Sequence, residues 1–189
     1  MDTTAATANN SLAHARAASS REELAGSRPI SGQYLTFQVT GQTYAMRIAA
    51  IKEIIEYGSM TSIPLMPAFI RGVINLRGAV VPVIDLAARM GFAPAEPSRR
   101  TCIVIVEMHH DAEVFEMGVV VDGVSEVLEL PAQDLEPPPS FGAKVRSDFI
   151  EAMARIRGQF VIVLRLEQVL SIDEVTQLAR MDFDMPRPQ

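Results

Sequence analysis

The histidines and the single cysteine are the residues that could bind a metal ion or act as a nucleophile. His109 and His110 are adjacent, whereas His14 is distant in the chain. Adjacent residues in a strand point to opposite faces, and a metal site needs three or four converging ligands. We therefore expect His109 and His110 in a solvated hairpin loop and no metal site. Cys102 lies in an apolar run and is expected to be a small buried side chain.

Two aspartates could serve in acid–base chemistry, but each has a structural explanation. Asp85 precedes a short apolar segment, where its side chain can cap a helix N-terminus. Asp122 precedes a glycine, and this dipeptide is typical of a tight turn. Residues 72–78 (GVINLRG) lack the Lys-Ser/Thr of a phosphate-binding loop, and no nucleophile-elbow motif occurs. We therefore expect neither enzymatic activity nor a cofactor.

The composition excludes several classes of protein. The chain has 189 residues, of which 48% are hydrophobic, so it can bury a core and is not disordered throughout. Its net charge of −6 argues against electrostatic binding to nucleic acid or to anionic lipid. The single cysteine fits a reducing compartment, the first residues lack a signal-peptide pattern, and no apolar run reaches the ~20 residues of a membrane span. A cytoplasmic protein is expected.

Short apolar runs separated by turn residues predict a mainly β protein. The dipeptides Arg77-Gly78, Asp122-Gly123 and Arg157-Gly158 each separate two such runs, and each predicts a tight hairpin because glycine tolerates positive φ. The expected strands cover residues 34–39, 43–48, 69–76, 79–84, 101–108, 114–121, 124–130, 149–156 and 159–166.

The expected helices are all short. Three isoleucines within residues 49–55 recur at helical spacing, so a helix is favoured there over a further strand. A second helix is expected over residues 86–90, after the capping Asp85 and before Gly91. A third is expected over residues 171–180, which open on a capping-box pattern.

The arrangement of these elements suggests two domains. Residues 1–32 lack an apolar stripe and are expected to form a disordered tail. Two similar halves follow, each with a hairpin at an Xaa-Gly turn, which suggests a duplicated small β-barrel. We place the first barrel at residues 33–98 and the second at 99–170, and we leave open that the chain crosses between them. Residues 171–189 would form a C-terminal helix and tail.

For some residues the sequence alone allows two interpretations, a structural role and a role in binding. Arg77, at a hairpin tip, could be a solvated turn residue or an arginine directed at a carboxylate or a partner. Glu53 could be an exposed charge or a member of an interaction site. Ile51, Ile54 and Ile55 could form an interface, although helical spacing favours a place in the core.

Five segments of the sequence form a long ordered pattern. The main ones are residues 66–78 (MPAFIRGVINLRG) and 80–86 (VVPVIDL), and the others are residues 51–55 (IKEII), 118–128 (GVVVDGVSEVL) and 162–164 (IVL). In these segments the chain resembles the CheW family of chemotaxis coupling proteins. The resemblance runs from about residue 33 to residue 170, which is almost the whole expected folded region.

The resemblance implies a fold and two partners. The fold would be two SH3-like five-stranded β-barrels packed around a hydrophobic groove, with short helices. One partner would be the regulatory domain of a CheA-type histidine kinase, and the other the cytoplasmic tip of a methyl-accepting chemoreceptor. By this resemblance the protein is a non-enzymatic adaptor that is recruited to membrane-associated receptor arrays without inserting into the membrane.

The resemblance also assigns residues to a receptor-binding surface. It implies that Ile51, Glu53 and Arg77 act in coupling and receptor contact, and that Gly118 and Val127 lie near the groove between the barrels. The family pairs the acidic and basic members across the first barrel, so the resemblance predicts a Glu53–Arg77 ion pair.

A separate kinase-binding surface is implied by three other residues. Tyr57, Met60 and Gly72 fall where the first barrel would meet the regulatory domain of the kinase. The chain departs from the family pattern at Ala87, where many members carry a basic residue, and at Cys102, where a larger apolar residue is usual. The long N-terminal tail is a further departure.

Other functions stay open from the sequence. The chain could serve a non-flagellar chemosensory pathway, such as one for surface motility or development. It could be an enzyme or metal protein built on the loop of His109 and His110. A phosphorylated response module is disfavoured because no paired-acid pocket occurs at strand ends.

Overall fold

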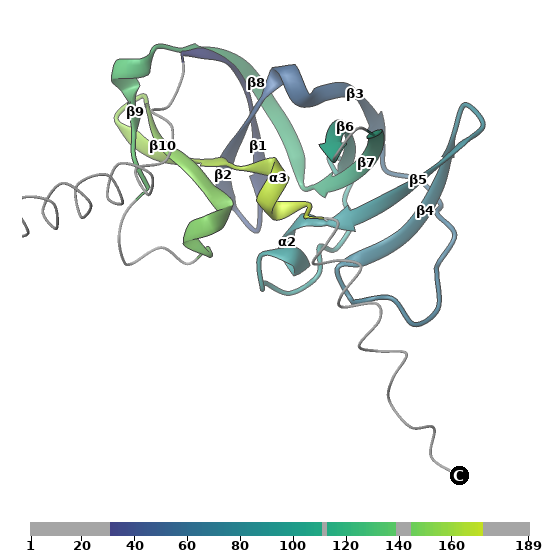
Figure 1. Cartoon of the computed structure of the whole chain (residues 1–189). Helices are drawn as coiled ribbons and strands as arrows, with labels where there is room; N and C mark the ends of the chain where they lie inside the picture. Colours follow the sequence, from purple (N-terminus) through teal and green to yellow (C-terminus); the bar gives the residue numbers. More distant parts are fainter. Residues whose placement is uncertain (1–30, 111–112, 139–144, 172–189) are drawn as a thin grey trace, which may run out of the picture.

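The computed structural model describes residues 31–110, 113–138 and 145–171 (Figure 1). Most of the expected N-terminal tail and all but the first residue of the expected helix 171–180 lie outside these ranges. The described strands are β1 (Gly32–Val39), β2 (Gln42–Arg47), β3 (Ile51–Glu56), β4 (Ile70–Leu76), β5 (Ala79–Asp85), β6 (Cys102–His110), β7 (Glu113–Val121), β8 (Gly123–Leu130), β9 (Leu135–Glu136), β10 (Ile150–Ile156) and β11 (Gln159–Leu164). The short helices are η1 (Ile48–Ala50), α2 (Leu86–Arg89), η2 (Ala132–Asp134), η3 (Ser147–Phe149) and α3 (Leu166–Val169).

The strands form two sheets, each of which curves into an SH3-like barrel. Barrel A has the strand order β8-β1-β2-β11-β10-β9, and barrel B has the order β3-β6-β7-β5-β4. The mainly β, two-barrel fold expected from the sequence is confirmed. Barrel B has the expected five strands, and barrel A has a sixth, the two-residue strand β9.

The chain crosses between the barrels, as the sequence left open, and the crossovers lie before β3 and before β8 instead of at residues 98 and 99. Barrel A takes β1 and β2 from the first half of the chain, and barrel B takes β6 and β7 from the second half. After each of these hairpins the chain crosses over, so β3 joins barrel B and β8 joins barrel A. The proline-rich loop before residue 99 therefore lies within barrel B.

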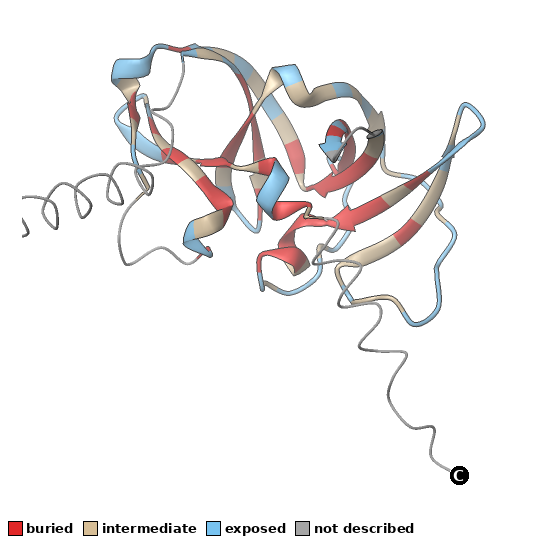
Figure 2. Cartoon of the chain, in the orientation of Figure 1, coloured by how far each residue is buried: buried red, intermediate tan, exposed pale blue. Residues whose placement is uncertain are grey.

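Three hydrophobic clusters hold the fold together. One lies inside barrel A and includes Tyr34 and Val163. A second lies inside barrel B and includes Val83 and Ile105. The largest joins the two barrels and draws residues from both, such as Phe37 of β1. Buried residues accordingly concentrate where the barrels meet (Figure 2). Burial of this shared apolar surface fixes the position of one barrel on the other.

The two barrels are built from the same sequence pattern. Residues 76–86 (LRGAVVPVIDL) form the β4–β5 turn, β5 and the start of α2. Residues 156–166 (IRGQFVIVLRL) form the β10–β11 turn, β11 and the start of α3. The parallel pairing of β5 with β7 likewise corresponds to that of β11 with β2. The duplication suggested by the sequence is therefore present as an approximate two-fold repeat of elements.

The helix predicted over residues 49–55 is wrong. Only Ile48–Ala50 form a short 3₁₀ turn, and Ile51–Glu56 form the edge strand β3. Burial alternates along β3 with period two, and the strand pairs with β6. Its isoleucines are β-branched and favour a pleated surface, so cross-strand pairing prevails over the helical spacing.

The hairpin predicted at Asp122-Gly123 is also wrong, because this dipeptide is the crossover from β7 to β8. The Asp122 carboxylate accepts a hydrogen bond from Thr40 N (2.7 Å), and Asp122 N donates to Gln38 O (2.9 Å). These bonds fasten the crossover to barrel A. The hairpins at Arg77-Gly78 and Arg157-Gly158 are confirmed, each with two residues at positive φ.

Two smaller predictions concern Asp85 and His109. Asp85 caps α2 as expected, since its Oδ1 accepts from Ala88 N (3.1 Å). His109 and His110 do not lie in a loop, because β6 and β7 pair as far as His110 and Glu113. The hairpin strands are longer than the apolar pattern indicated, since backbone pairing continues beyond the last apolar residue.

Arg89 lies buried between the barrels, near the centre of the repeat. Its guanidinium carbon is 5.0 Å from the ring centroids of both Phe69 and Phe149, which precede the equivalent strands β4 and β10. Its Nε donates to the carbonyl of Val169 at the end of α3 (2.6 Å). A single cationic side chain thus connects α2, α3 and both aromatic rings.

Replacing Arg89 should weaken this inter-barrel contact. We expect Arg89→Met to lower the free energy of unfolding by about 2 kcal/mol, because it removes a buried donor and two ring contacts. Urea unfolding would measure the change. The exposed Arg99 supplies the control, and Arg99→Met should change stability by less than about 0.5 kcal/mol. Equal effects of the two substitutions would contradict a central role for Arg89.

Candidate partner-binding surfaces

The predicted Glu53–Arg77 ion pair is confirmed. Arg77 lies in the β4–β5 turn, and its two terminal nitrogens donate to the two Glu53 oxygens at 2.7 and 2.9 Å. The turn itself is held by Asn75, whose Oδ1 accepts from Gly78 N (2.9 Å). A paired fork of this kind fixes the direction of the guanidinium as well as its position.

This ion pair connects the two edges of barrel B. Glu53 is on the edge strand β3, whereas Arg77 follows the opposite edge strand, β4. The Arg77 side chain is 72% exposed and that of Glu53 is 23% exposed. Solvent screening limits the net contribution of such a pair to roughly 0–1 kcal/mol. The pair therefore adds little stability, and the guanidinium stays open to solvent on its outer side.

Ile51, Ile54 and Val127 lie on edge strands beside the inter-barrel core. Ile51 packs against that core, in agreement with the buried alternative for this residue. Ile54 on β3 and Val127 on β8 are 42% and 47% exposed. Their cross-strand partners, Val104 and Leu35, are both buried in the inter-barrel core. Directly paired residues share a face, so Ile54 and Val127 extend this apolar core to the surface.

Gly118 lies on β7 with the position of a Cβ turned to the interior of barrel B. It is buried on β7, and a Cβ at this position would lie 2.8 Å from Ile103 Cγ2 and 3.1 Å from Val83 Cγ2. Both neighbours belong to the interior cluster of barrel B. Any influence of Gly118 on a receptor would therefore act through the packing of β7.

Tyr57, Met60 and Gly72 are brought together by the connection of residues 57–69. Tyr57 and Met60 pack against the interior cluster of barrel B. Gly72 is buried, and its backbone approaches Thr61 closely. Thr61 and Val73 exchange two backbone hydrogen bonds of 2.9 Å, which attach the connection to the edge of β4. Gly72 thus positions this segment and has no side chain to contact a partner.

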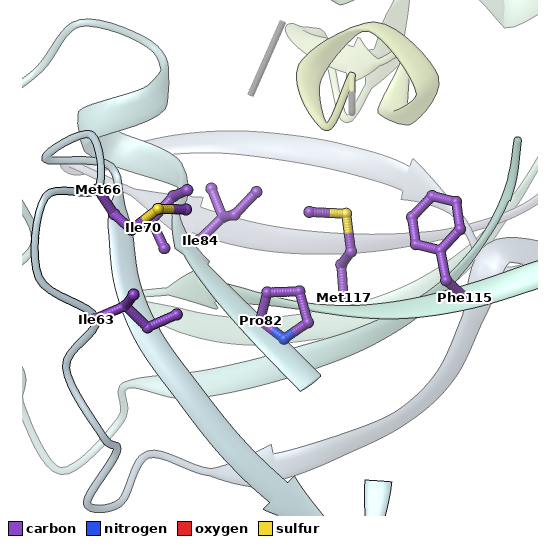
Figure 3. A pocket seen from close by; sticks show the side chains of 7 residues that line it. All are labelled: Ile63, Met66, Ile70, Pro82, Ile84, Phe115 and Met117. Carbon is purple, nitrogen blue, oxygen red and sulfur yellow. The ribbon is translucent and has the colours of Figure 1, made fainter. Parts of the chain in front are cut away.

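An apolar pocket of about 130 Å³ opens beside the same connection (Figure 3). Its walls come from the connection itself and from the strands β4, β5 and β7, and are formed by Ile63, Met66, Ile70, Pro82, Ile84, Phe115 and Met117. All seven are apolar, so the pocket suits an apolar side chain rather than a charged ligand.

Exposed apolar residues continue the pocket toward solvent. Ile63 and Leu65 of the connection are 39% and 61% exposed, and Val80 is 72% exposed. Val80 lies on β5 two residues before Pro82, so both side chains point to the same face of the strand. We call this surface, made of the pocket, Leu65 and Val80, the pocket face. It shares no residue with the surface of Ile54 and Val127.

The remaining candidate groups for chemistry do not form a site. Cys102 is buried as expected, and burial raises the pKa of its thiol, so the thiol stays protonated near neutral pH and is a weak nucleophile. The His109 side chain is 73% exposed, with Nε2 3.8 Å from Glu107 Oε1. Within residues 31–110, 113–138 and 145–171, no three His, Cys, Asp or Glu side chains converge as metal ligands. No helix in these ranges is long and apolar enough to cross a membrane.

Sequence reasoning missed several surface residues. The pocket combines Ile63 and Met66 with Phe115 and Met117, which are distant in sequence and meet only through the parallel pairing of β5 with β7. A second ion pair, Arg157–Glu126, was also not predicted. The matching Arg-Gly turns of the two halves were the signal that could have indicated it.

Paired SH3-like barrels with separate apolar surfaces define a binding module, and comparisons with known proteins specify its family. The family model of the CheW-like domain matches residues 33–174. The chain is 33% identical over 153 residues to the chemotaxis protein CheW of Klebsiella aerogenes, covering 81% of this chain and 89% of that protein. It is 32% identical over 142 residues to CheW of Rhizobium meliloti, covering 75% of this chain and 89% of the relative.

The structural comparison agrees with the sequence matches. The crystal structure of the scaffolding protein TtCheW from Thermoanaerobacter tengcongensis superposes with a TM-score of 0.69 at 30% identity. The match covers 76% of this chain and 95% of that protein. This chain belongs to the CheW-like family of chemotaxis scaffold proteins.

Two glycine substitutions test how firmly residues 57–69 are held. In Gly72→Ala the new Cβ would lie 2.3 Å from the Thr61 carbonyl oxygen, at a φ of +145°. We expect a loss of more than about 2 kcal/mol in the free energy of unfolding, because backbone must move. Gly78→Ala, at a φ of +90° with open space around it, should cost about 1 kcal/mol. Thermal and urea unfolding would measure both, and equal losses would show that the connection shifts freely.

Proposed function

We propose that this protein is a non-enzymatic adaptor that couples methyl-accepting chemoreceptors to a CheA-type histidine kinase in membrane-associated signalling arrays. The observation that carries this proposal is the presence of two separate apolar surfaces on the paired barrels. One is the surface around Ile54, Val127 and the Glu53–Arg77 pair, and the other is the pocket face. Membership of the CheW-like family supports the choice of partners.

We assign the receptor to the first surface. Ile54 and Val127 offer an apolar strip between two edge strands, which suits the apolar side of a helical receptor tip. The exposed Arg77 guanidinium is held by Glu53, the residue before Ile54 on β3, and suits an acidic side chain on that tip.

We assign the regulatory domain of the kinase to the pocket face. Tyr57, Met60 and Gly72 hold residues 57–69 in place, and this segment provides Ile63 and Met66 to the pocket. The implied kinase-binding residues would therefore act by shaping the pocket face more than by direct contact. An apolar side chain of the kinase would fill the pocket, with Leu65 and Val80 around it.

Coupling follows from holding two partners at once. Each contact would bury roughly 1,000 Å² of surface or less and would be weak alone. Repetition across an array would raise the effective affinity. Receptor state can change kinase activity only if the two bound arrangements differ in free energy. The inter-barrel core would transmit such a difference because it fixes the relative position of the two surfaces.

The receptor assignment is tested by Arg77→Ala. We expect a folded protein with a melting temperature lowered by no more than a few degrees, because an exposed ion pair contributes little. Receptor-dependent control of kinase activity should fall about threefold or more in a reconstituted mixture of receptor fragment, kinase and adaptor. If Arg77→Ala unfolds the protein, or leaves coupling unchanged, the assignment is wrong.

The kinase assignment is tested by two valine substitutions. Val80→Asp places a charge on the pocket face and should weaken binding to the purified kinase regulatory domain about tenfold. Val114→Asp is the matched control, because Val114 is 57% exposed and its neighbour Phe115 points to the opposite face of β7. Calorimetry should show a change of less than about twofold for Val114→Asp. Equal losses for the two variants would contradict a kinase site on the pocket face.

A further inference from the structure

In barrel B, a buried carboxylate fastens the segment that follows α2. Asp85 is fully buried, and its Oδ2 accepts a hydrogen bond from Ala95 N (2.9 Å). Arg71 Nε lies 2.9 Å from the same oxygen, and Arg71 Nη2 donates to the carbonyl of Ala95. Ala95 packs against both the cluster inside barrel B and the inter-barrel core, and Phe92 packs against the latter. Residues 92–95 thus cover this end of barrel B.

Arg165 of barrel A occupies the position that corresponds to Asp85. Each residue stands between the last strand of its barrel and the short helix that follows, with φ/ψ of −78°/108° at Asp85 and −87°/95° at Arg165. Asp85 N donates to the carbonyl of Phe69 (2.7 Å), and Arg165 N donates to that of Phe149 (2.8 Å). Because the backbone has the same conformation and the same bond at both positions, the two side chains leave it in the same direction. The repeat therefore places a cation in barrel A where barrel B has a buried anion.

The Arg165 guanidinium has no carboxylate to pair with in the part of the chain that the structure describes. Its side chain is half-buried, and no hydrogen bond or ion pair from a described residue engages it. In barrel B the partner of Asp85 is Arg71, which lies at the bulge of β4. The equivalent bulge of β10 carries Glu151, so this position has also changed sign. Glu151 pairs with Arg47 of β2 instead of with Arg165.

The sequence supplies carboxylates directly after the last described residue. When the two repeats are aligned through α2 and α3, residues 92–95 (FAPA) correspond to residues 172–175 (IDEV). Both segments begin and end on an apolar residue. The segment of barrel A has Asp173 and Glu174 at its centre, where that of barrel B has no charge. The change from an anion to a cation on the barrel is thus matched by acidic residues in the segment.

Barrel A also lacks a described residue in the place that Ala95 takes in barrel B. The cluster inside barrel B includes Ala95, which follows α2. Among the described residues, the cluster inside barrel A contains none beyond Val163 of β11. The inter-barrel core continues as far as Leu170 at the end of α3, so the next residues of the chain start from this core.

We infer that residues 172–175 cover the end of barrel A as residues 92–95 cover that of barrel B, and that Arg165 holds them through the acidic pair at their centre. Ile172 packs against the inter-barrel core, and Val175 packs against the cluster inside barrel A. A guanidinium binds carboxylates with directional, charge-assisted hydrogen bonds, which suits this role. The occupant is a segment of this chain, because it begins two residues after Leu170 and needs no long connection to reach the site.

Charge reversal tests the ion pair in the purified full-length protein. We expect Arg165→Glu to lower the melting temperature by about 4 °C, because it places like charges together. Reversing Asp173 and Glu174 to arginine should lower it by a similar amount. Combining all three substitutions should restore at least about half of the loss, since opposite charges then face each other again. Losses that add up without any restoration would show that these groups do not pair.

Arg155 is the matched control for this experiment. It lies on β10 of the same barrel, its side chain is 58% exposed, and it pairs with Glu136 of β9. Arg155→Glu should change the melting temperature by less than about 2 °C, because an exposed pair contributes little. Reversal of Asp173 and Glu174 should not offset this change. Equal restoration in the Arg155→Glu background would mean that the effect comes from net charge alone, and the inference would be wrong.

Hydrogen exchange of the unaltered protein tests the docking of the segment directly. We expect the amides of residues 172–178 to exchange at least about tenfold more slowly than in a free peptide of the same sequence. Arg165→Glu should remove most of this protection, and so should Ile172→Asp, which breaks the apolar contact. Exchange of the segment at the rate of the free peptide in the unaltered protein would overturn the inference.

A binding measurement separates this role from a partner contact. If Arg165→Glu leaves both the melting temperature and the exchange unchanged but weakens binding of the kinase regulatory domain, the guanidinium faces a partner and the inference is wrong. The proposed adaptor function is tested independently, because the melting and exchange experiments use the isolated protein and involve neither receptor nor kinase.

Discussion

The two crossovers of the chain, before β3 and before β8, are the constraint on which the rest of the structure depends. Barrel B is the continuous run β3–β7, whereas barrel A combines β1 and β2 with β8–β11. The crossovers bring the outer faces of both sheets together, where they bury the aliphatic cluster that includes Phe37, Leu86 and Val119. Arg89 adds a polar and aromatic contact between α2 and α3. The two barrels therefore behave as one body.

A single body with several surfaces suits a protein that holds neighbours in register. The pocket face and the surface of Ile54 and Val127 share no residue, yet both continue from the inter-barrel core through Ile84 and Val104. Small packing changes in that core can therefore reach both surfaces. A protein of this kind needs no reacting group, because its effect on an attached kinase comes from geometry and differences in binding free energy.

The sequence predicted most strands and two of their hairpins, but not which barrel each strand joins. Alternating apolar residues and Xaa-Gly turns located most strands, and the Asp85 cap followed from one residue and its neighbours. The β3 strand was mistaken for a helix because Ile51, Ile54 and Ile55 fit helical spacing, and only pairing with β6 shows the strand. The Asp122-Gly123 crossover resembles a hairpin locally and differs only in which sheet receives β8. The Glu53–Arg77 pair was predicted by family resemblance, whereas the pocket depends on long-range packing that local patterns do not specify.

The crossovers also have a consequence for the origin of the fold. Each half of the chain, β1–β5 or β6–β11, places its first hairpin in one barrel and its later strands in the other. Two copies of such a half could complete each other by trading that hairpin, as in a domain-swapped homodimer. Joining the copies end to end would turn the intertwined dimer into one polypeptide. The halves could then diverge, so that one kept an open pocket and the other acquired β9.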